Sequence, residues 1–162
     1  GGEIRDRLLS NVDLLPTLLD LIDVPIPDNV EGLSFADYVA ETSASPKRDA
    51  VFSVFQGKDI RSIRTDRYKL IRNFQARRLL PVPVDMTKNS HPTEKCPVVQ
   101  LFDLQRDPNE FNDVSRNLGY AKTRKYLSGR LWDWMESVDD PSLSGPLPSP
   151  YYHEAINEYR TR

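Results

Sequence analysis

The chain has 162 residues, enough for one domain with appended segments. Its formal net charge of −2 excludes a strong overall attraction to nucleic acid or to an anionic membrane surface. The sequence contains no run of about 18 apolar residues, so we expect no membrane span. Cys96 is the single cysteine, which excludes an internal disulfide.

The first part of the chain predicts a helix over residues 13–23. Asp13 is a favourable helix cap, and Pro16 falls in the first turn, where a missing N–H is not needed. Apolar residues cover much of this helix and predict burial on more than one side: Leu14, Leu15, Leu18, Leu19, Leu21 and Ile22. Ser34 is expected to cap a second, short helix over residues 35–39.

The middle of the chain predicts a roughly four-stranded antiparallel sheet, with strands over residues 50–56, 59–65, 67–74 and 98–104. In the third strand, alternation places Tyr68, Leu70, Arg72 and Phe74 on one mostly apolar face, as expected of a sheet covered on one side. Residues 75–97 contain four prolines and predict a long connection, a feature that is often functional.

The last part predicts a helix over residues 120–138 that covers the sheet and gives an α+β fold. Its apolar stripe contains Leu127, Leu131, Trp134, Met135 and Val138, so we expect Trp134 in the core and Trp132 against the C-terminal tail or a missing domain. Residues 141–162 predict a proline-rich tail along a surface, with one or two helical turns after residue 153.

Three segments together resemble the C-terminal end of the sulfatases, which hydrolyse sulfate esters and N-sulfates. They are residues 10–21 (SNVDLLPTLLDL), 61–74 (RSIRTDRYKLIRNF) and 101–110 (LFDLQRDPNE). Details of residues 64–74, 81–85 and 132–141 are similar to the heparan N-sulfatase (N-sulfoglucosamine sulfohydrolase) branch.

The resemblance implies three parts. Residues 1–49 would be the end of the α/β catalytic domain, with helix 13–23 left over from it. Residues 50–140 would form the C-terminal antiparallel-sheet subdomain, and residues 141–162 the tail.

The resemblance also implies a chemistry: a formylglycine nucleophile, made within a Cys/Ser-x-Pro/Ala-x-Arg motif, beside a divalent cation that is usually Ca²⁺. This chain lacks the motif. Pro97 follows Cys96 directly and Gln100 stands in place of Arg, while Ala44 occupies the nucleophile position of residues 44–48. We therefore expect no catalytic residue and no cofactor in this chain, an inactive fragment, and catalytic groups upstream in the parent enzyme.

Metal ligands and acid–base groups are equally scarce. The pairs Asp28-Asn29 and Asp139-Asp140 have no recognisable oxygen ligands nearby in sequence, and such groups at turns and helix ends are usually solvated or capping. The two histidines, His91 and His153, are more often structural or exposed than catalytic at such positions. We expect no metal site in this chain.

Basic residues are the stronger binding signal, because the arginine fork matches sulfate. Seven fall within residues 61–78: Arg61, Arg64, Arg67, Lys69, Arg72, Arg77 and Arg78. Alternatively, those on the strands alternate on a solvated face or pair with Asp59, Asp66 and Glu110. Loop residues have the better claim, because a strand face packed on another domain cannot reach substrate. The candidate substrate-binding residues are Gln56, Lys58, Arg77, Arg78 and His91.

The expected function is to support the fold and to form the pocket rim of a parent sulfatase acting on a sulfated glycan. Its partners would be the N-terminal sulfatase domain and sulfated carbohydrate, in a periplasmic, secreted or lysosomal parent. An exposed apolar patch is expected around Leu14, Leu15, Leu18 and Leu19, so the fragment should self-associate or cover the patch with its own tail. Two alternatives stay open: a phosphatase or phosphodiesterase of the same alkaline phosphatase superfamily, or a free-standing module that binds sulfated polymers.

Overall fold

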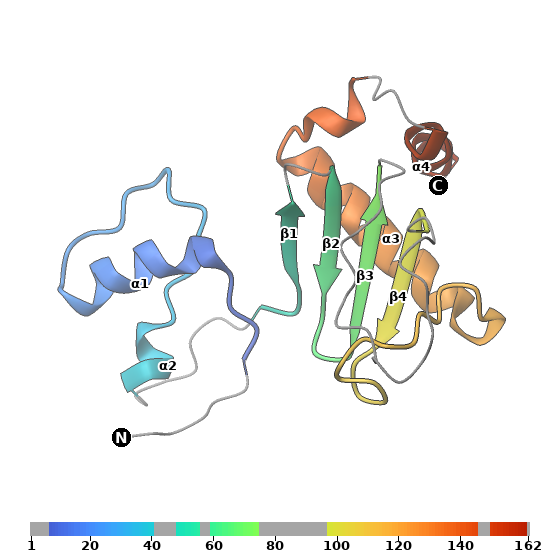
Figure 1. The fold of residues 1–162 in the computed structure, drawn as a ribbon. Coiled ribbons are helices and arrows are strands. Elements are labelled where there is room, and N and C mark those ends of the chain that lie inside the picture. Colours follow the sequence, from blue (N-terminus) through green and yellow to red (C-terminus); the bar gives the residue numbers. More distant parts are fainter. Residues whose placement is uncertain (1–6, 41–47, 56–58, 75–96, 146–149, 162) are drawn as a thin grey trace. The chain divides into compact units, whose positions relative to one another are not determined.

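The computed structural model describes residues 7–40, 48–55, 59–74, 97–145 and 150–161 (Figure 1). The chain divides into two compact units, Gly1–Val51 and Phe52–Arg162.

The first unit is helical, with η1 (Asn11–Asp13), α1 (Leu14–Leu21) and α2 (Ala36–Ala40). The Ser34 hydroxyl accepts a hydrogen bond from the Ala36 N–H at 3.2 Å, which confirms the predicted cap of the second helix. Gly32 lies so close to Val12 that a Cβ would stand 1.9 Å from the Val12 carbonyl oxygen. This close approach requires glycine.

Asp13 ties this unit together, but not in the predicted way. Its side chain does not cap α1. The carboxylate is 1% exposed and accepts hydrogen bonds from the N–H groups of Ser10 and Leu33, both at 2.9 Å, and from Arg48 Nε at 2.8 Å. Burial raises the pKa of Asp13, but these hydrogen bonds lower it by more, so the pKa lies below its ordinary value. Asp13 thus joins three segments that are distant in sequence.

The apolar surface of α1 is not covered by the described residues of the first unit. Side chains that are half or more exposed are Leu14, Leu15, Leu18, Leu21 and Ile22, and Leu18 reaches 61%. Leu19 is partly buried. The predicted burial of α1 on more than one side therefore needs atoms that this part of the chain does not supply.

The second unit is built on a sheet with the strand order β1-β2-β3-β4 (Figure 1). The strands are β1 (Val51–Phe55), β2 (Ile60–Arg64), β3 (Tyr68–Asn73) and β4 (Val99–Asp103). Pairing is antiparallel, with Ile63 opposite Leu70 and Leu70 opposite Leu101. Each strand lies within the predicted range and ends within one residue of it, and the α+β class is confirmed.

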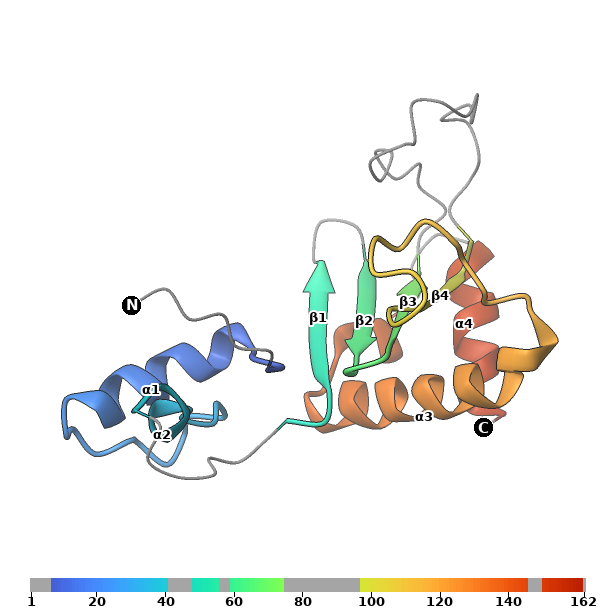
Figure 2. The same cartoon turned by 90° about the horizontal axis from the view of Figure 1, so that it is seen from below.

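Helix α3 (Ala121–Ser137) follows η3 (Leu118–Tyr120) and covers one face of the sheet, while residues 104–117 pass over the other (Figure 2). The core between α3 and the sheet is apolar and contains Ile63, Leu70, Phe74, Leu101, Leu127, Leu131 and Met135. The chain continues through η4 (Pro141–Leu143) to α4 (Pro150–Arg160), which contacts β3. The C-terminal segment therefore forms an 11-residue helix, longer than the one or two turns predicted after residue 153.

The core tryptophan of α3 is Trp132, so the prediction that Trp134 lies in the core was wrong. Trp132 is 1% exposed, and its ring centroid lies 6.0 Å from Phe74 and 5.7 Å from Tyr159 of α4. The contact with Tyr159 confirms the expected packing of Trp132 on the C-terminal segment. Trp134 stacks instead on Phe52 of β1, with centroids 4.9 Å apart.

Two arginines are buried on the covered face of the sheet. Arg61 and Arg72 lie opposite one another in the β2–β3 register and are 4% and 1% exposed. Arg61 donates to Asp140 at 2.6 and 3.0 Å, and Arg72 donates to both carboxylate oxygens of Glu158 at 2.9 Å. Each buried charge is thus neutralised by a residue that follows α3.

Replacing Asp140 with Asn should destabilise the second unit by about 3 kcal/mol, because it leaves the buried charge of Arg61 without its counter-charge. The measurement is urea unfolding at pH 7. The matched control is Asp139→Asn: this neighbour is exposed, and its φ of 50° is one that Asn tolerates. Equal losses in the two variants would contradict the assignment.

The same pair predicts a pH dependence. Burial raises the pKa of Asp140, but hydrogen bonds from Arg61 and Ser142 lower it by more, so the pKa lies below its ordinary value of 3.8. A carboxylate with a lowered pKa stabilises the fold above pH 3.8, and this contribution is lost as the pH falls below that value. Between about pH 5 and pH 2, Asp140→Asn should therefore lose less stability than the unchanged chain. Identical pH profiles would refute this.

Candidate functional site

The five residues predicted to bind substrate, Gln56, Lys58, Arg77, Arg78 and His91, lie outside the described residues, as does Cys96. The described residues that flank them are informative. In an antiparallel sheet with this strand order, the β1–β2 and β3–β4 connections leave from the same end of the strands.

The residues that flank the two connections contact one another at this end of the sheet. The N–H of Phe74, directly after β3, donates to the Asp59 carbonyl before β2 at 3.0 Å. The Asn73 side chain donates to the Pro97 carbonyl at 2.6 Å. The chain ends that flank the β3–β4 connection are therefore neighbours of each other and of the chain that enters β2.

The basic residues of the strands form ion pairs, so the pairing interpretation is confirmed for them. Besides the two buried pairs, Lys69 lies 2.6 Å from Glu110 and Arg67 lies 2.9 Å from Asp103, while Arg64 is 4.0 Å from Glu110. Glu110 is a partner that the sequence indicated. Asp103, Asp140 and Glu158 come from elements that sequence reasoning did not connect to these arginines.

Asp103 lies at the centre of a small polar cluster at the end of β4. It is 3% exposed and accepts hydrogen bonds from Arg67 and from the Tyr120 hydroxyl, the latter at 3.2 Å. The hydrogen bond from Arg67 holds the pKa of Asp103 below its ordinary value, even though burial opposes this. A carboxylate paired in this way maintains the junction between sheet and η3 and is not poised for acid–base chemistry.

The described residues do not fit a metal centre. Within them, no group of three His, Cys, Asp or Glu side chains could hold a cation. Asp140 is engaged by Arg61, and Asp28 and Asn29 lie in an exposed turn. The described helices are also too short or too polar to cross a bilayer.

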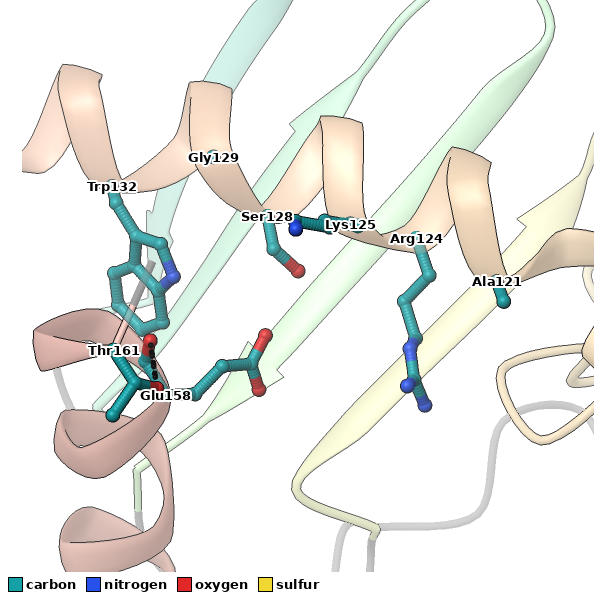
Figure 3. A pocket seen from close by; sticks show the side chains of 8 residues that line it. All are labelled: Ala121, Arg124, Lys125, Ser128, Gly129, Trp132, Glu158 and Thr161. Atoms are coloured by element: carbon teal, nitrogen blue, oxygen red, sulfur yellow. Dashed lines mark hydrogen bonds between the residues drawn. The ribbon is translucent and has the colours of Figure 1, made fainter.

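One pocket lies between α3 and α4, with a volume of about 560 Å³ (Figure 3). It is lined by Ala121, Arg124, Lys125, Ser128, Gly129, Trp132, Glu158 and Thr161. Sequence reasoning missed it, because residues 141–162 were expected to form a tail and only the α4 helix creates the second wall. The one available signal was the apolar and aromatic spacing of Tyr152, Ile156 and Tyr159.

Comparison with known proteins identifies the family. A family model described as N-sulphoglucosamine sulphohydrolase, C-terminal, matches residues 1–137. The chain belongs to this family. The resemblance to the C-terminal end of the sulfatases, and to the N-sulfoglucosamine sulfohydrolase branch, is confirmed.

Individual proteins that this chain resembles are also sulfatases. An ulvan-active sulfatase of Formosa agariphila is 26% identical over 157 residues, covering 86% of this chain and 31% of the relative. An arylsulfatase of Clostridium perfringens is 30% identical over 145 residues, covering 89% of this chain and 26% of the relative. The solved structure of a 2-O GAG sulfatase has the same fold, with a TM-score of 0.62 and 20% identity over 90% of this chain and 28% of that one. The chain thus spans about a third or less of the relatives it matches.

Proposed function

We propose that this chain is the C-terminal part of a sulfatase that hydrolyses sulfate esters or N-sulfates of a sulfated glycan. The observation that carries the proposal is the pattern of coverage: 86–89% of this chain matches only 31% of the ulvan-active sulfatase and 26% of the arylsulfatase. Within the described residues, no group of three His, Cys, Asp or Glu side chains could hold a metal ion. The chemistry would therefore reside in a preceding N-terminal domain.

In this proposal the N-terminal domain carries the formylglycine and binds Ca²⁺, and the parent is exported. This chain would support the fold and form part of the pocket rim. The exposed apolar face of α1, with Leu14, Leu15, Leu18, Leu21 and Ile22, supports a missing packing partner, because solvent-exposed apolar patches of this kind mark interaction surfaces. In the isolated chain, the same face would drive self-association.

The first test is activity. The isolated chain should not hydrolyse p-nitrophenyl sulfate with or without Ca²⁺, whereas the parent enzyme should. Replacing the Cys or Ser of the parent's formylglycine motif with Ala should abolish the rate. A parent that hydrolyses p-nitrophenyl phosphate in preference to the sulfate would support the phosphatase alternative instead. Metal-dependent hydrolysis by the pure chain would overturn the proposal.

The second test addresses the α1 face. Leu18→Glu should shift the isolated chain from oligomer to monomer in sedimentation velocity, since a charge on the apolar face opposes its burial. Leu118→Glu is the matched control, because Leu118 is 90% exposed in the second unit and should not change the sedimentation. A monomeric unchanged chain would contradict the self-association.

The third test addresses the rim residues. We propose that Gln56, Lys58, Arg77, Arg78 and His91 contribute to substrate binding. The proposal is supported by the strand order, because the two connections that contain these residues leave from the same end of the sheet. In the parent, the double change Arg77→Ala and Arg78→Ala should raise KM for a sulfated oligosaccharide several-fold. It should leave p-nitrophenyl sulfate hydrolysis nearly unchanged, because loss of uniform binding raises KM without changing kcat.

The control removes two positive charges from exposed, described positions: Arg116→Ala with Lys122→Ala. This control should leave the hydrolysis of both substrates unchanged. Equal losses on both substrates in the Arg77/Arg78 variant would indicate a folding defect or a direct catalytic role, and either result would defeat the rim assignment.

A further inference from the structure

The pocket between α3 and α4 has an excess of positive charge. Among its lining residues Glu158 is the one acid, and both its carboxylate oxygens accept hydrogen bonds from the buried Arg72. Arg124 donates one N–H to the Ser115 carbonyl at 3.1 Å. Across the described part of the chain, the Lys125 ammonium has no ion-pair or hydrogen-bond partner. Because Glu158 is paired with Arg72, the positive charges of Arg124 and Lys125 are not balanced by an acid of the pocket lining.

Two buried N–H groups beside the pocket lack acceptors. Trp132 Nε1 and Arg72 Nε are buried, and neither has a partner among the described residues. Figure 3 shows the indole nitrogen on the side of the ring that faces the space between Ser128 and Glu158. Buried N–H groups almost always have an acceptor, so two neighbouring exceptions call for an explanation. Both N–H dipoles add to the positive electrostatic potential next to the pocket, although neither atom is exposed to it.

Gly129 keeps the pocket open. It lies in the middle of α3, where glycine weakens a helix relative to alanine. A Cβ at this position would meet no atom within 4 Å, so close packing does not require glycine here. The missing side chain leaves space in the pocket wall that a larger residue would fill.

We propose that this pocket binds one acidic saccharide unit of a sulfated glycan, with its sulfate or carboxylate held by Lys125 and Arg124. Lysine and arginine form strong charge-assisted hydrogen bonds to such groups. The volume of about 560 Å³ lies within the range of roughly 300–1,000 Å³ that is usual for small-ligand sites. The anionic character follows from the pocket itself, whereas the saccharide carrier rests on the proposed function.

The test measures binding by the chain itself. Trp134→Phe leaves Trp132 as the single tryptophan, so its emission reports on the pocket. Titration with a heparin-derived tetrasaccharide should give a saturable change in this emission. A neutral N-acetylglucosamine tetramer should give none.

Two variants, each made in the Trp134→Phe background, locate the site. Gly129→Leu should weaken tetrasaccharide binding at least 10-fold by filling the pocket, with circular dichroism and thermal unfolding confirming that the fold is kept. Lys125→Gln should weaken binding about 3- to 10-fold, in line with the loss of one charge-assisted contact. Lys122→Gln, which removes an equal charge from α3 outside the pocket, should change binding less than 2-fold.

Unchanged binding in Gly129→Leu, or equal losses in the Lys122 and Lys125 variants, would overturn the pocket assignment. Equal binding of the neutral tetramer would overturn its anionic specificity. These outcomes are separate from the proposed function, because they do not depend on hydrolysis. A parent with normal p-nitrophenyl sulfate hydrolysis whose C-terminal chain fails to bind the tetrasaccharide would defeat the pocket alone.

Discussion

A buried guanidinium group must have an acceptor, and the architecture of the second unit depends on this constraint. Arg61 and Arg72 lie opposite one another on the covered face of the sheet, an arrangement that repulsion between like charges would make costly if neither were paired. Their partners, Asp140 and Glu158, both follow α3. The family match ends at residue 137, so both neutralising carboxylates come after it. The segment beyond α3 is therefore required to complete the polar part of this core.

The strands could be predicted from sequence because their signal is local. Alternation in Tyr68–Asn73 assigned the faces of β3 correctly. The ion pairs could not be predicted in the same way. Arg61 and Asp140 are 79 residues apart and Arg72 and Glu158 are 86 apart, so no local pattern links them. The arginines were recognisable as candidates for anion binding, but whether the anion is a substrate or a carboxylate of the chain itself depends on the tertiary structure.

Helix α3 shows a second limit. Its existence and bounds follow from periodicity, yet two overlapping apolar stripes are possible, one through Trp134 and one through Trp132. The choice between them is made by α4, because Tyr159 packs on Trp132. Since residues 141–162 contain several prolines, α4 was expected to be only a turn or two, and the deciding contact could not be foreseen. The pocket was missed for the same reason. Its residues Ser128, Trp132 and Glu158 are brought together only when both helices are in place.

The end of α3 has a consequence for how this family can vary in length. The helix stops at Ser137, Asp139 adopts a φ of 50°, and Asp140 then reaches Arg61. Each residue of an α-helix advances the chain by about 1.5 Å and turns it by roughly 100°. Inserting or deleting one residue within α3 would therefore rotate Asp140 away from the sheet. Homologous chains should keep the spacing between the core of α3 and this aspartate, and should accept insertions in residues 104–117, which precede the helix and leave its phase unchanged.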